Sequence, residues 1–241
     1  MKCVILCAGY ATRLYPVTLE YPKHLLKIKD KPIVQYIYEK LHKLTDIDEI
    51  ILVTNNKFYS VFKNWIDKTK SEITLINDKT NCLEEKLGGI EDLYFAIENL
   101  NIDDDLLVIC GDNFFEFNLK NFVDFSKIKN SVAIAVYDVG DLEKAKRFGV
   151  VKVNNEVLKD FQEKPEKPVS SLVSTGIYFF PKTKIKEIEN YIKTNKNKDG
   201  VGYLIKYLCQ NENVYSYIFK ELWYDVGTIE QYKFLQEKYS K

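Results

Sequence analysis

The chain has 241 residues, 46% of them hydrophobic, and its 35 Lys and Arg residues balance 35 Asp and Glu residues. This length fits one large domain with a substantial core, and less well two small domains. Balanced charge argues against a nucleic-acid surface or an anionic membrane surface as the main binding partner. The composition therefore fits a globular protein with a substantial core.

Five cysteines occur in the chain: Cys3, Cys7, Cys82, Cys110 and Cys209. None has C-x-x-C spacing to another, and an odd number inside apolar runs is typical of buried free thiols. Neither a zinc site nor a disulfide framework is expected. Met1 and Lys2 lead directly into an apolar run, and no apolar run approaches the ~20 residues of a membrane helix. We expect a soluble, cytoplasmic protein, and the sequence leaves a homo-oligomer open.

Apolar strands alternate with helical patterns over the first 117 residues. Strands are predicted at 3–7, 49–54, 73–77 and 105–110. Apolar residues at helical spacing predict helices at 32–41, 58–66 and 90–100. This alternation is typical of a parallel, Rossmann-like α/β core, in which ligands bind at the carboxyl ends of the strands. We expect 1–117 to form a nucleotide-binding core.

The second half follows a different pattern. After a helix at 118–126, strands are predicted at 131–139, 148–153, 157–161, 174–180 and 214–219. Helices are predicted near 182–193, near 201–209, and after a capping-box pair formed by Thr228 and Gln231. We interpret 118–241 as an acceptor-binding half with a C-terminal helix. The predicted fold is a single α/β domain. It has a Rossmann-like, mixed and mostly parallel sheet, helices on both faces and a smaller α+β substrate-binding insertion.

The stretch from Cys3 to Lys23 carries the first candidate site. Its apolar strand ends in a small-residue loop made of Ala8, Gly9, Tyr10, Ala11 and Thr12. A backbone with few large side chains approaches a phosphate closely, and successive N–H groups form an anion-binding concavity. Arg13 adds a guanidinium fork and Lys23 a second cation. Arg13 and Arg147 are the two arginines of a lysine-rich chain, which favours a specific task over the alternative of a solvated turn.

Two aspartates at strand ends are candidate metal ligands. Asp112 follows Gly111 after the apolar strand 105–110, and Asp225 precedes Gly227 at a short strand end. Mg²⁺ takes one or two protein carboxylates and completes its shell with phosphates and water. The alternatives are a turn aspartate at 112 and a helix-dipole partner at 225, because Thr228 begins a helix.

The first of these stretches resembles the signature of the sugar-phosphate nucleotidyltransferases, approximately L-A-x-G-x-G-T-R-L-x-P-x-T followed by P-K. Here it reads LCAGYATRLYPVT at 6–18, followed by Pro22 and Lys23, with Ala11 at the position of the usual second glycine. The resemblance covers nearly the whole chain in separated motifs that keep the family order. It implies nucleotide contacts for the loop, Arg13, Lys23 and Gly111, and metal-binding roles for Asp112 and Asp225.

The resemblance also implies the acceptor contacts. The segments Phe148–Val151 and Glu163–Pro165 look like the family's Y-G-V-V and E-K-P motifs, with Phe148 in place of the usual tyrosine. The segment Thr175–Tyr178 resembles its sugar-contacting strand. Carried over to this sequence, the expected acceptor contacts are Gly149, Glu163, Lys164, Thr175 and Gly176.

The base pocket is the least defined part of the predicted site. Relatives that use thymidine or uridine nucleotides commonly carry a glutamine before a G-T-A segment, whereas this chain reads NCLEEKLGG at 81–89. Gly88 is expected to let the base approach the backbone. His24, next to Lys23, is a weaker phosphate-contact candidate whose alternative is a structural or solvated role, and His42 is expected at the surface.

The expected function is Mg²⁺-dependent transfer of a nucleoside monophosphate from an NTP to a sugar 1-phosphate, with Arg13, Lys23 and Asp112 catalytic. One alternative is a cytidylyltransferase that acts on a non-sugar phosphate such as phosphocholine. Another is a non-catalytic, nucleotide-binding regulatory subunit, which would be expected to lose Arg13 or an aspartate. A nicotinamide-dependent dehydrogenase is disfavoured, because the loop lacks G-x-G-x-x-G and no acidic residue ends the strand at 49–54.

Overall fold

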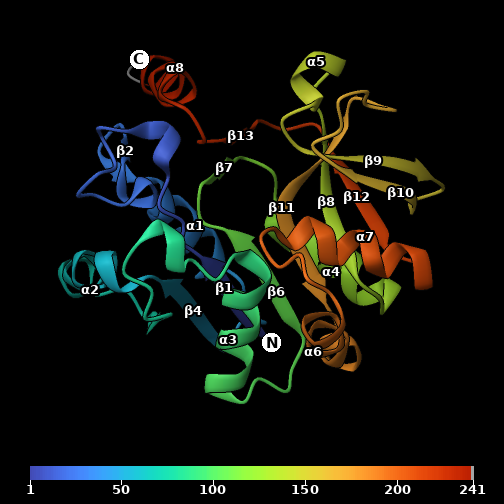
Figure 1. The fold of residues 1–241 in the computed structure, drawn as a ribbon, viewed down its shortest axis with the longest axis horizontal. Helices are drawn as coiled ribbons and strands as arrows, with labels where there is room; N and C mark the ends of the chain where they lie inside the picture. Colours follow the sequence, from blue (N-terminus) through green and yellow to red (C-terminus); the bar gives the residue numbers. More distant parts are fainter. Residues whose placement is uncertain (240–241) are drawn as a thin grey trace.

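One large sheet runs through the protein, whose computed structural model describes residues 1–239 (Figure 1). From edge to edge its nine strands are β5 (Thr74–Asn77), β4 (Glu49–Thr54), β1 (Lys2–Leu6), β6 (Leu106–Cys110), β11 (Leu172–Phe180), β8 (Ala133–Asp138), β12 (Tyr215–Phe219), β10 (Val157–Glu163) and β9 (Gly149–Asn154). Strands β10 and β11 run against the direction that the others share. The predicted mixed, mostly parallel sheet is confirmed.

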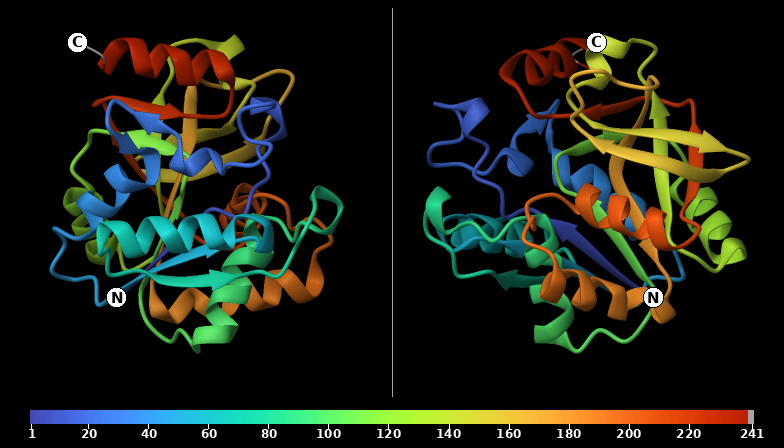
Figure 2. Two further views of the ribbon diagram at one scale, coloured as in Figure 1. Left: turned by 90° about the vertical axis from the view of Figure 1, so that its left-hand side faces the viewer. Right: turned by 45° about the vertical axis from the view of Figure 1, so that its right-hand side comes forward.

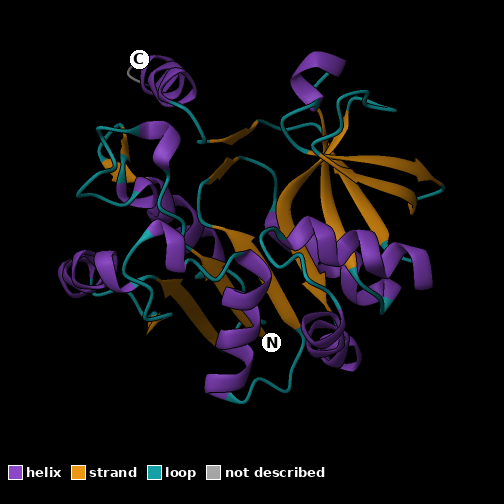
Figure 3. Cartoon of the chain, in the orientation of Figure 1, coloured by secondary structure: helices purple, strands orange, loops and turns teal. Residues whose placement is uncertain are grey.

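Helices cover both faces of this sheet (Figure 3). The α-helices are α1 (Ile33–Leu41), α2 (Asn56–Thr69), α3 (Gly89–Leu100), α4 (Leu119–Lys129), α5 (Leu142–Ala145), α6 (Ile185–Thr194), α7 (Val201–Asn211) and α8 (Ile229–Tyr239). Apolar residues of α1, α2 and α4 share one core cluster, and those of α3, α6 and α7 share another. The alternation of β1 explains the division, since Cys3 and Ile5 belong to the first cluster and Val4 and Leu6 to the second.

Two short two-stranded sheets and helix α8 complete the fold. Strand β7 (Asn113–Phe115) pairs with β13 (Trp223–Asp225), and β2 (Lys27–Ile28) pairs with β3 (Lys31–Pro32). A third core cluster joins these parts through Leu14, Phe114 and Leu235. In Figure 2, α8 lies at the end of the molecule opposite the N-terminus. The third core cluster thereby holds helix α8 near the loop that follows β1.

Several boundaries differ from those expected. The first helix begins at Ile33, one residue after Pro32, whose extended ψ of 149° makes it the residue before the helix. Strand β11 begins at Leu172, because Leu172 and Val173 pair with β8. The predicted strands of the second half lie in the same sheet as those of the first half. No helix among residues 1–239 is long and apolar enough to cross a membrane.

Candidate active site

The carboxyl ends of β1 and β6 bring the two main candidate motifs together. These strands are parallel neighbours, with Leu6 opposite Cys110. The N–H of Gly111 donates to the carbonyl of Leu6 at 2.9 Å. A Cβ on Gly111 would collide with the Sγ atom of Cys7, so this close approach requires glycine. The small-residue loop and Asp112 therefore leave the same edge of the sheet, as expected.

The small-residue loop has the shape of an open cradle. Its first part is held by the Asn55 side-chain amide, which donates to the carbonyl of Ala8 at 2.8 Å. Ala11 adopts a left-handed conformation, with φ 51° and ψ 43°, before the 3₁₀ turn Thr12–Leu14. Gly9 is exposed, and a Cβ there would meet no protein atom within 4 Å. The space in front of Gly9 is thus free for a phosphate, and Thr12 and Arg13 are exposed beside it.

The aspartates predicted as metal ligands lie side by side. The backbone N–H of Val226 donates to the carbonyl of Asp112 at 3.0 Å, and Asp225 pairs with Asn113 in the β7–β13 ladder. The ammonium group of Lys23 contacts the carboxylate of Asp112. Burial raises the pKa of Asp112, but the charge and hydrogen bond of Lys23, together with other neighbours, lower that pKa to about 2. Burial and the charge of Asp112 raise the pKa of Asp225 to about 7.

This pair of acids has the chemistry of a divalent-cation site. Two carboxylates are held together at a cavity wall, and the ammonium group of Lys23 binds Asp112. Burial and the neighbouring carboxylate of Asp112 disfavour the charge of Asp225, and a bound cation would favour it. A hard cation that takes two protein carboxylates and fills its shell with phosphate and water oxygens fits these donors. Among residues 1–239 no cluster of three or more His, Cys, Asp or Glu ligands forms a complete protein-built metal site.

A cavity of about 220 Å³ collects most of the remaining candidates. Its lining contains the predicted residues Arg13, Asp112, Gly149, Glu163, Lys164, Thr175, Gly176 and Asp225. These residues come from segments as distant in sequence as the β1 loop and β13. The sheet brings them together because β9 pairs with β10 and β11 lies next to β6. Nucleotide-loop and acceptor-strand candidates therefore face one space.

The acceptor side of this cavity is shaped by close backbone packing. A Cβ on Gly149 would collide with the ring of Phe161, and Gly176 has φ 77° with the Sγ atom of Cys110 next to it. Lys164 adopts φ 45°, and its N–H donates to the carbonyl of Phe148 at 3.0 Å. This turn leaves the Lys164 side chain 61% exposed at the cavity rim. Its cation is therefore available to an anionic ligand.

Glu163 and Thr175 differ in how free their polar groups are. Glu163 is 15% exposed, and its Oε1 atom lies 3.6 Å from the Nζ atom of Lys164. Burial raises the pKa of Glu163, and Lys164 opposes that shift. The Thr175 hydroxyl donates to the carbonyl of Ala135 at 3.0 Å. Glu163 thus offers a carboxylate to the cavity, whereas the Thr175 hydroxyl is already bonded within the protein.

Gly88 lies away from this cavity. It has φ 99°, and a Cβ there would come within 2.7 Å of both the Asp199 Cα and the Lys198 carbonyl oxygen. The N–H of Ile90 donates to that Lys198 carbonyl at 3.1 Å. The need for glycine at 88 is therefore explained by the backbone of 198–199.

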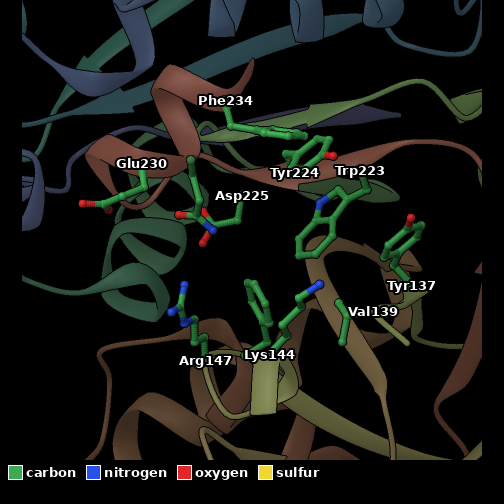
Figure 4. Close-up of a pocket in the computed structure, with 11 residues that line it drawn as sticks. Tyr137, Val139, Lys144, Arg147, Trp223, Tyr224, Asp225, Glu230 and Phe234 are labelled. Atoms are coloured by element: carbon green, nitrogen blue, oxygen red, sulfur yellow. The ribbon is translucent and has the colours of Figure 1, made fainter. Parts of the chain in front are cut away.

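A second cavity of about 510 Å³ meets the first at Asp225 (Figure 4). Its aromatic lining consists of Tyr137, Phe148, Trp223, Tyr224 and Phe234. Figure 4 shows Arg147 and Lys144 on one side, opposite Trp223 and Tyr224 on the other. The two cavities adjoin, because they share four lining residues: Arg147, Phe148, Trp223 and Asp225.

Many residues of these walls were not predicted as site residues from the sequence, among them Cys110, Asn113, Arg147 and Trp223. A signal existed for Arg147, the second of the two arginines. The Trp223 indole N–H donates to the side-chain oxygen of Asn113 at 2.5 Å, a contact between residues 110 positions apart. His24 is 2% exposed, and burial together with the charge of Lys23 lowers its pKa to about 3. His24 is therefore a neutral core residue, and His42 is exposed as expected.

Comparison with known proteins agrees with this arrangement. The nucleotidyl transferase family profile matches residues 2–241, so the chain belongs to that family. The bifunctional protein GlmU of Methanocaldococcus jannaschii is 34% identical over 99% of this chain and 55% of its own length. A putative mannose-1-phosphate guanyltransferase of Sulfolobus acidocaldarius is 29% identical over 96% of this chain and 61% of its own length. The chain thus spans little more than half the length of these relatives.

Solved structures show the same fold. The crystal structure of a putative glucose-1-phosphate thymidylyltransferase from Bacillus anthracis, in complex with sucrose, matches with a TM-score of 0.84 and 26% identity, covering 99% of this chain and 95% of that one. A UDP-glucose pyrophosphorylase complexed with UDP-glucose matches with a TM-score of 0.81 and 24% identity over 99% and 98% of the two chains. The resemblance to sugar-phosphate nucleotidyltransferases is confirmed.

Proposed function

We propose that this chain transfers a nucleoside monophosphate from an NTP to a sugar 1-phosphate, giving an NDP-sugar and pyrophosphate. The observation that carries the proposal is the shared cavity in which Arg13 and the Asp112–Asp225 pair face Glu163 and Lys164. Arg13 and Lys164 supply positive charge on two sides of the acid pair, as a reaction between two phosphate groups requires. The family membership and the names of the relatives support the same reaction class.

The chain's own residues have distinct tasks in this reaction. An acceptor phosphate is already anionic, so no side-chain nucleophile is needed, and catalysis consists of positioning and charge stabilisation. Lys164 holds the acceptor phosphate, and Glu163 hydrogen-bonds sugar hydroxyl groups. The α-phosphorus lies near Lys23, and Arg13 neutralises the departing pyrophosphate. The loop N–H groups around Gly9 bind the other phosphates.

Asp112 and Asp225 would hold Mg²⁺. When bound, the ion supplies positive charge that stabilises the phosphate oxygens in the transition state. Lys23 contacts Asp112 in the protein alone, so its ammonium is placed to move to a phosphate oxygen when the cation takes the acid. Mg²⁺ is usually bound by one or two carboxylates together with substrate phosphates, and these two acids would supply the protein's share of its ligands.

A phosphocholine acceptor is the second candidate, and the larger cavity is the observation that favours it. Five aromatic side chains line that cavity together with Asp225 and Glu230, a composition that attracts a quaternary ammonium group. Lys144 and Arg147 in the same lining repel such a cation. The balance favours the sugar acceptor beside Glu163 and Lys164.

The test is pyrophosphate release with Mg²⁺, using four NTPs against a panel of sugar 1-phosphates and phosphocholine. We expect turnover with one NTP and one sugar 1-phosphate, abolished in Asp112→Ala. Turnover with phosphocholine alone would replace the first candidate by the second. Absence of NTP binding, measured separately by calorimetry, would overturn both.

A further inference from the structure

Two buried acids lie beside the small-residue loop and outside both cavities. Asp78 follows strand β5 and Asp92 lies in the first turns of α3, and each residue is 6% exposed. Their carboxyl groups are hydrogen-bonded to each other. A hydrogen bond between two carboxyl groups needs a proton on one of them, because an ionised carboxylate can only accept.

The surroundings favour that proton. The neighbouring charges that raise the pKa of Asp92 belong to Asp78, Glu91 and Asp199, and these three are negative. Burial and then the charge of Asp78 raise the pKa of Asp92 to about 8, and burial also raises the pKa of Asp78. Among residues 1–239, no N–H or hydroxyl group donates to the buried Oδ1 atom of Asp92.

The neighbouring cations have other partners. Lys198 pairs with Glu91 at 2.6 Å and Lys86 pairs with Asp199 at 2.8 Å. Two further titratable neighbours, the Cys7 thiol and the Tyr10 phenol, are uncharged at neutral pH because burial raises the pKa of each. A proton is therefore the cation that this pair of acids retains.

The pair is connected to the small-residue loop through Thr80. Asp78 Oδ1 accepts the Thr80 N–H at 2.8 Å and the Thr80 hydroxyl at 2.9 Å. Because that hydroxyl donates to Asp78, it accepts from the hydroxyl of Tyr10, 3.2 Å away. Tyr10 lies between Gly9 and Ala11 of the loop and is 5% exposed. Any movement of Asp78 therefore reaches the loop backbone through two hydrogen bonds.

The same pair closes the segment 79–88. Asp78 precedes this segment, and its N–H donates to the carbonyl of Thr54 at 2.9 Å, which ties it to the end of β4. Asp92 lies beyond the other end of the segment, and its N–H donates to the carbonyl of Gly88 at 2.9 Å. The shared proton therefore joins the two ends of the segment next to the cradle.

We propose that Asp78 and Asp92 share one proton and act as positioning residues for the NTP, holding the 79–88 segment closed and Tyr10 in place. This inference rests on the proposed function. Loss of the proton would leave two negative charges in contact inside the protein, and their repulsion would open the segment. NTP binding is then expected to weaken at alkaline pH, while residues that contact the acceptor are unaffected.

The first test measures unfolding by denaturant between pH 5 and 10. A group whose pKa is raised on folding contributes stability that is lost as pH rises through its folded-state pKa. Wild type is therefore expected to lose stability up to and through about pH 8. Asp92→Asn keeps a hydrogen-bond donor to Asp78 without a titrating proton, so this variant should lose less stability as the pH rises. Asp67→Asn, on the surface of α2 with a side chain 63% exposed, is the matched control and should follow wild type.

The second test measures the NTP KM and kcat over the same pH range. In wild type the KM should rise by up to about tenfold per pH unit above the midpoint, because the competent fraction falls with the proton. The KM of Asp92→Asn should stay flat. Tyr10→Phe, which removes the link and keeps both acids, should raise the KM at every pH and leave the pH profile of unfolding like that of wild type.

Each result decides a separate step. Unfolding profiles that coincide for wild type and Asp92→Asn would overturn the shared proton, and Asp78→Asn provides a second variant if Asp92→Asn does not fold. If the unfolding profiles of wild type and Asp92→Asn differ but their NTP KM values change with pH in the same way, the positioning role would be overturned. A protein that binds no NTP at any pH overturns the proposed function, whereas the unfolding profiles still decide the proton.

Discussion

The backbone N–H of Val226 donates to the carbonyl of Asp112 at 3.0 Å, joining two residues 114 positions apart at the edge of the site. The next rung of the same pairing sets Asp225 against Asn113. A carboxylate from the middle of the chain and another from near its end are thereby held together by backbone geometry. Side-chain flexibility contributes little to their spacing, and a cation between them would meet a preformed pair.

Asp225→Asn tests this acid pair without removing its hydrogen-bonding shape. A metal held at the pair contributes several kcal/mol of charge stabilisation, so we expect turnover to fall by about a hundredfold or more. Stability at pH 8 should not fall, because burial and Asp112 raise the pKa of Asp225 to about 7 and its charge is unfavourable above that pH. Steady-state kinetics and thermal unfolding at pH 8 measure the two effects. Loss of both activity and stability would contradict this explanation.

Arg147→Ala tests the residue that lines both cavities. A guanidinium that bonds a charged substrate contributes 1.5–3 kcal/mol, so we expect kcat/KM to fall by roughly ten- to a hundredfold. The adjacent Lys146 pairs with Glu143 at 2.7 Å and lines neither cavity, which makes Lys146→Ala the matched control. Equal kinetics for the two variants would remove Arg147 from the site.

Ala11→Gly tests the left-handed position of the loop. A non-glycine residue in that conformation costs about 1–2 kcal/mol, whereas glycine adds about 0.4–1 kcal/mol of unfolded-state entropy. We therefore expect a stability change between about 0 and +1 kcal/mol and a lower NTP KM, because the loop reaches its conformation without strain. Ala8→Gly is the control, since Ala8 is buried and has no positive φ, and it should lose about 1 kcal/mol. Denaturant unfolding with NTP titration makes the comparison.

Gly88→Ala tests whether this glycine serves packing. The added Cβ would lie 2.7 Å from the Asp199 Cα at a φ of 99°, so we expect a loss of about 1–3 kcal/mol in the protein without any ligand. Gly9→Ala is the contrasting variant, because its Cβ meets open space. Its stability should change by less than about 0.5 kcal/mol, while NTP binding weakens. An unchanged melting temperature for Gly88→Ala would instead favour a role at the base.

Much of this protein is determined by local sequence. The spacing of apolar residues indicates which side chains within a short segment are buried. This spacing predicted β1, β4, β6 and the helices between them. Glycine and aspartate directly after an apolar strand mark a sheet edge, which is why Asp112 and the Arg13 loop could be expected to face one space. The small residues at 8–12 predict a phosphate cradle because they leave the N–H groups of their own backbone open to a phosphate.

Tertiary structure alone decided the remaining features. The joining of both halves into one sheet, the presence of Arg147 and Asp225 in the lining of one cavity, and the interaction of Asp78 with Asp92 depend on strand order and helix packing. Gly88 illustrates the difference, since its partners at 198–199 lie 110 residues away and leave no trace in the neighbouring sequence. Local patterns encode burial and turn geometry, whereas contacts between distant residues arise from packing the whole core.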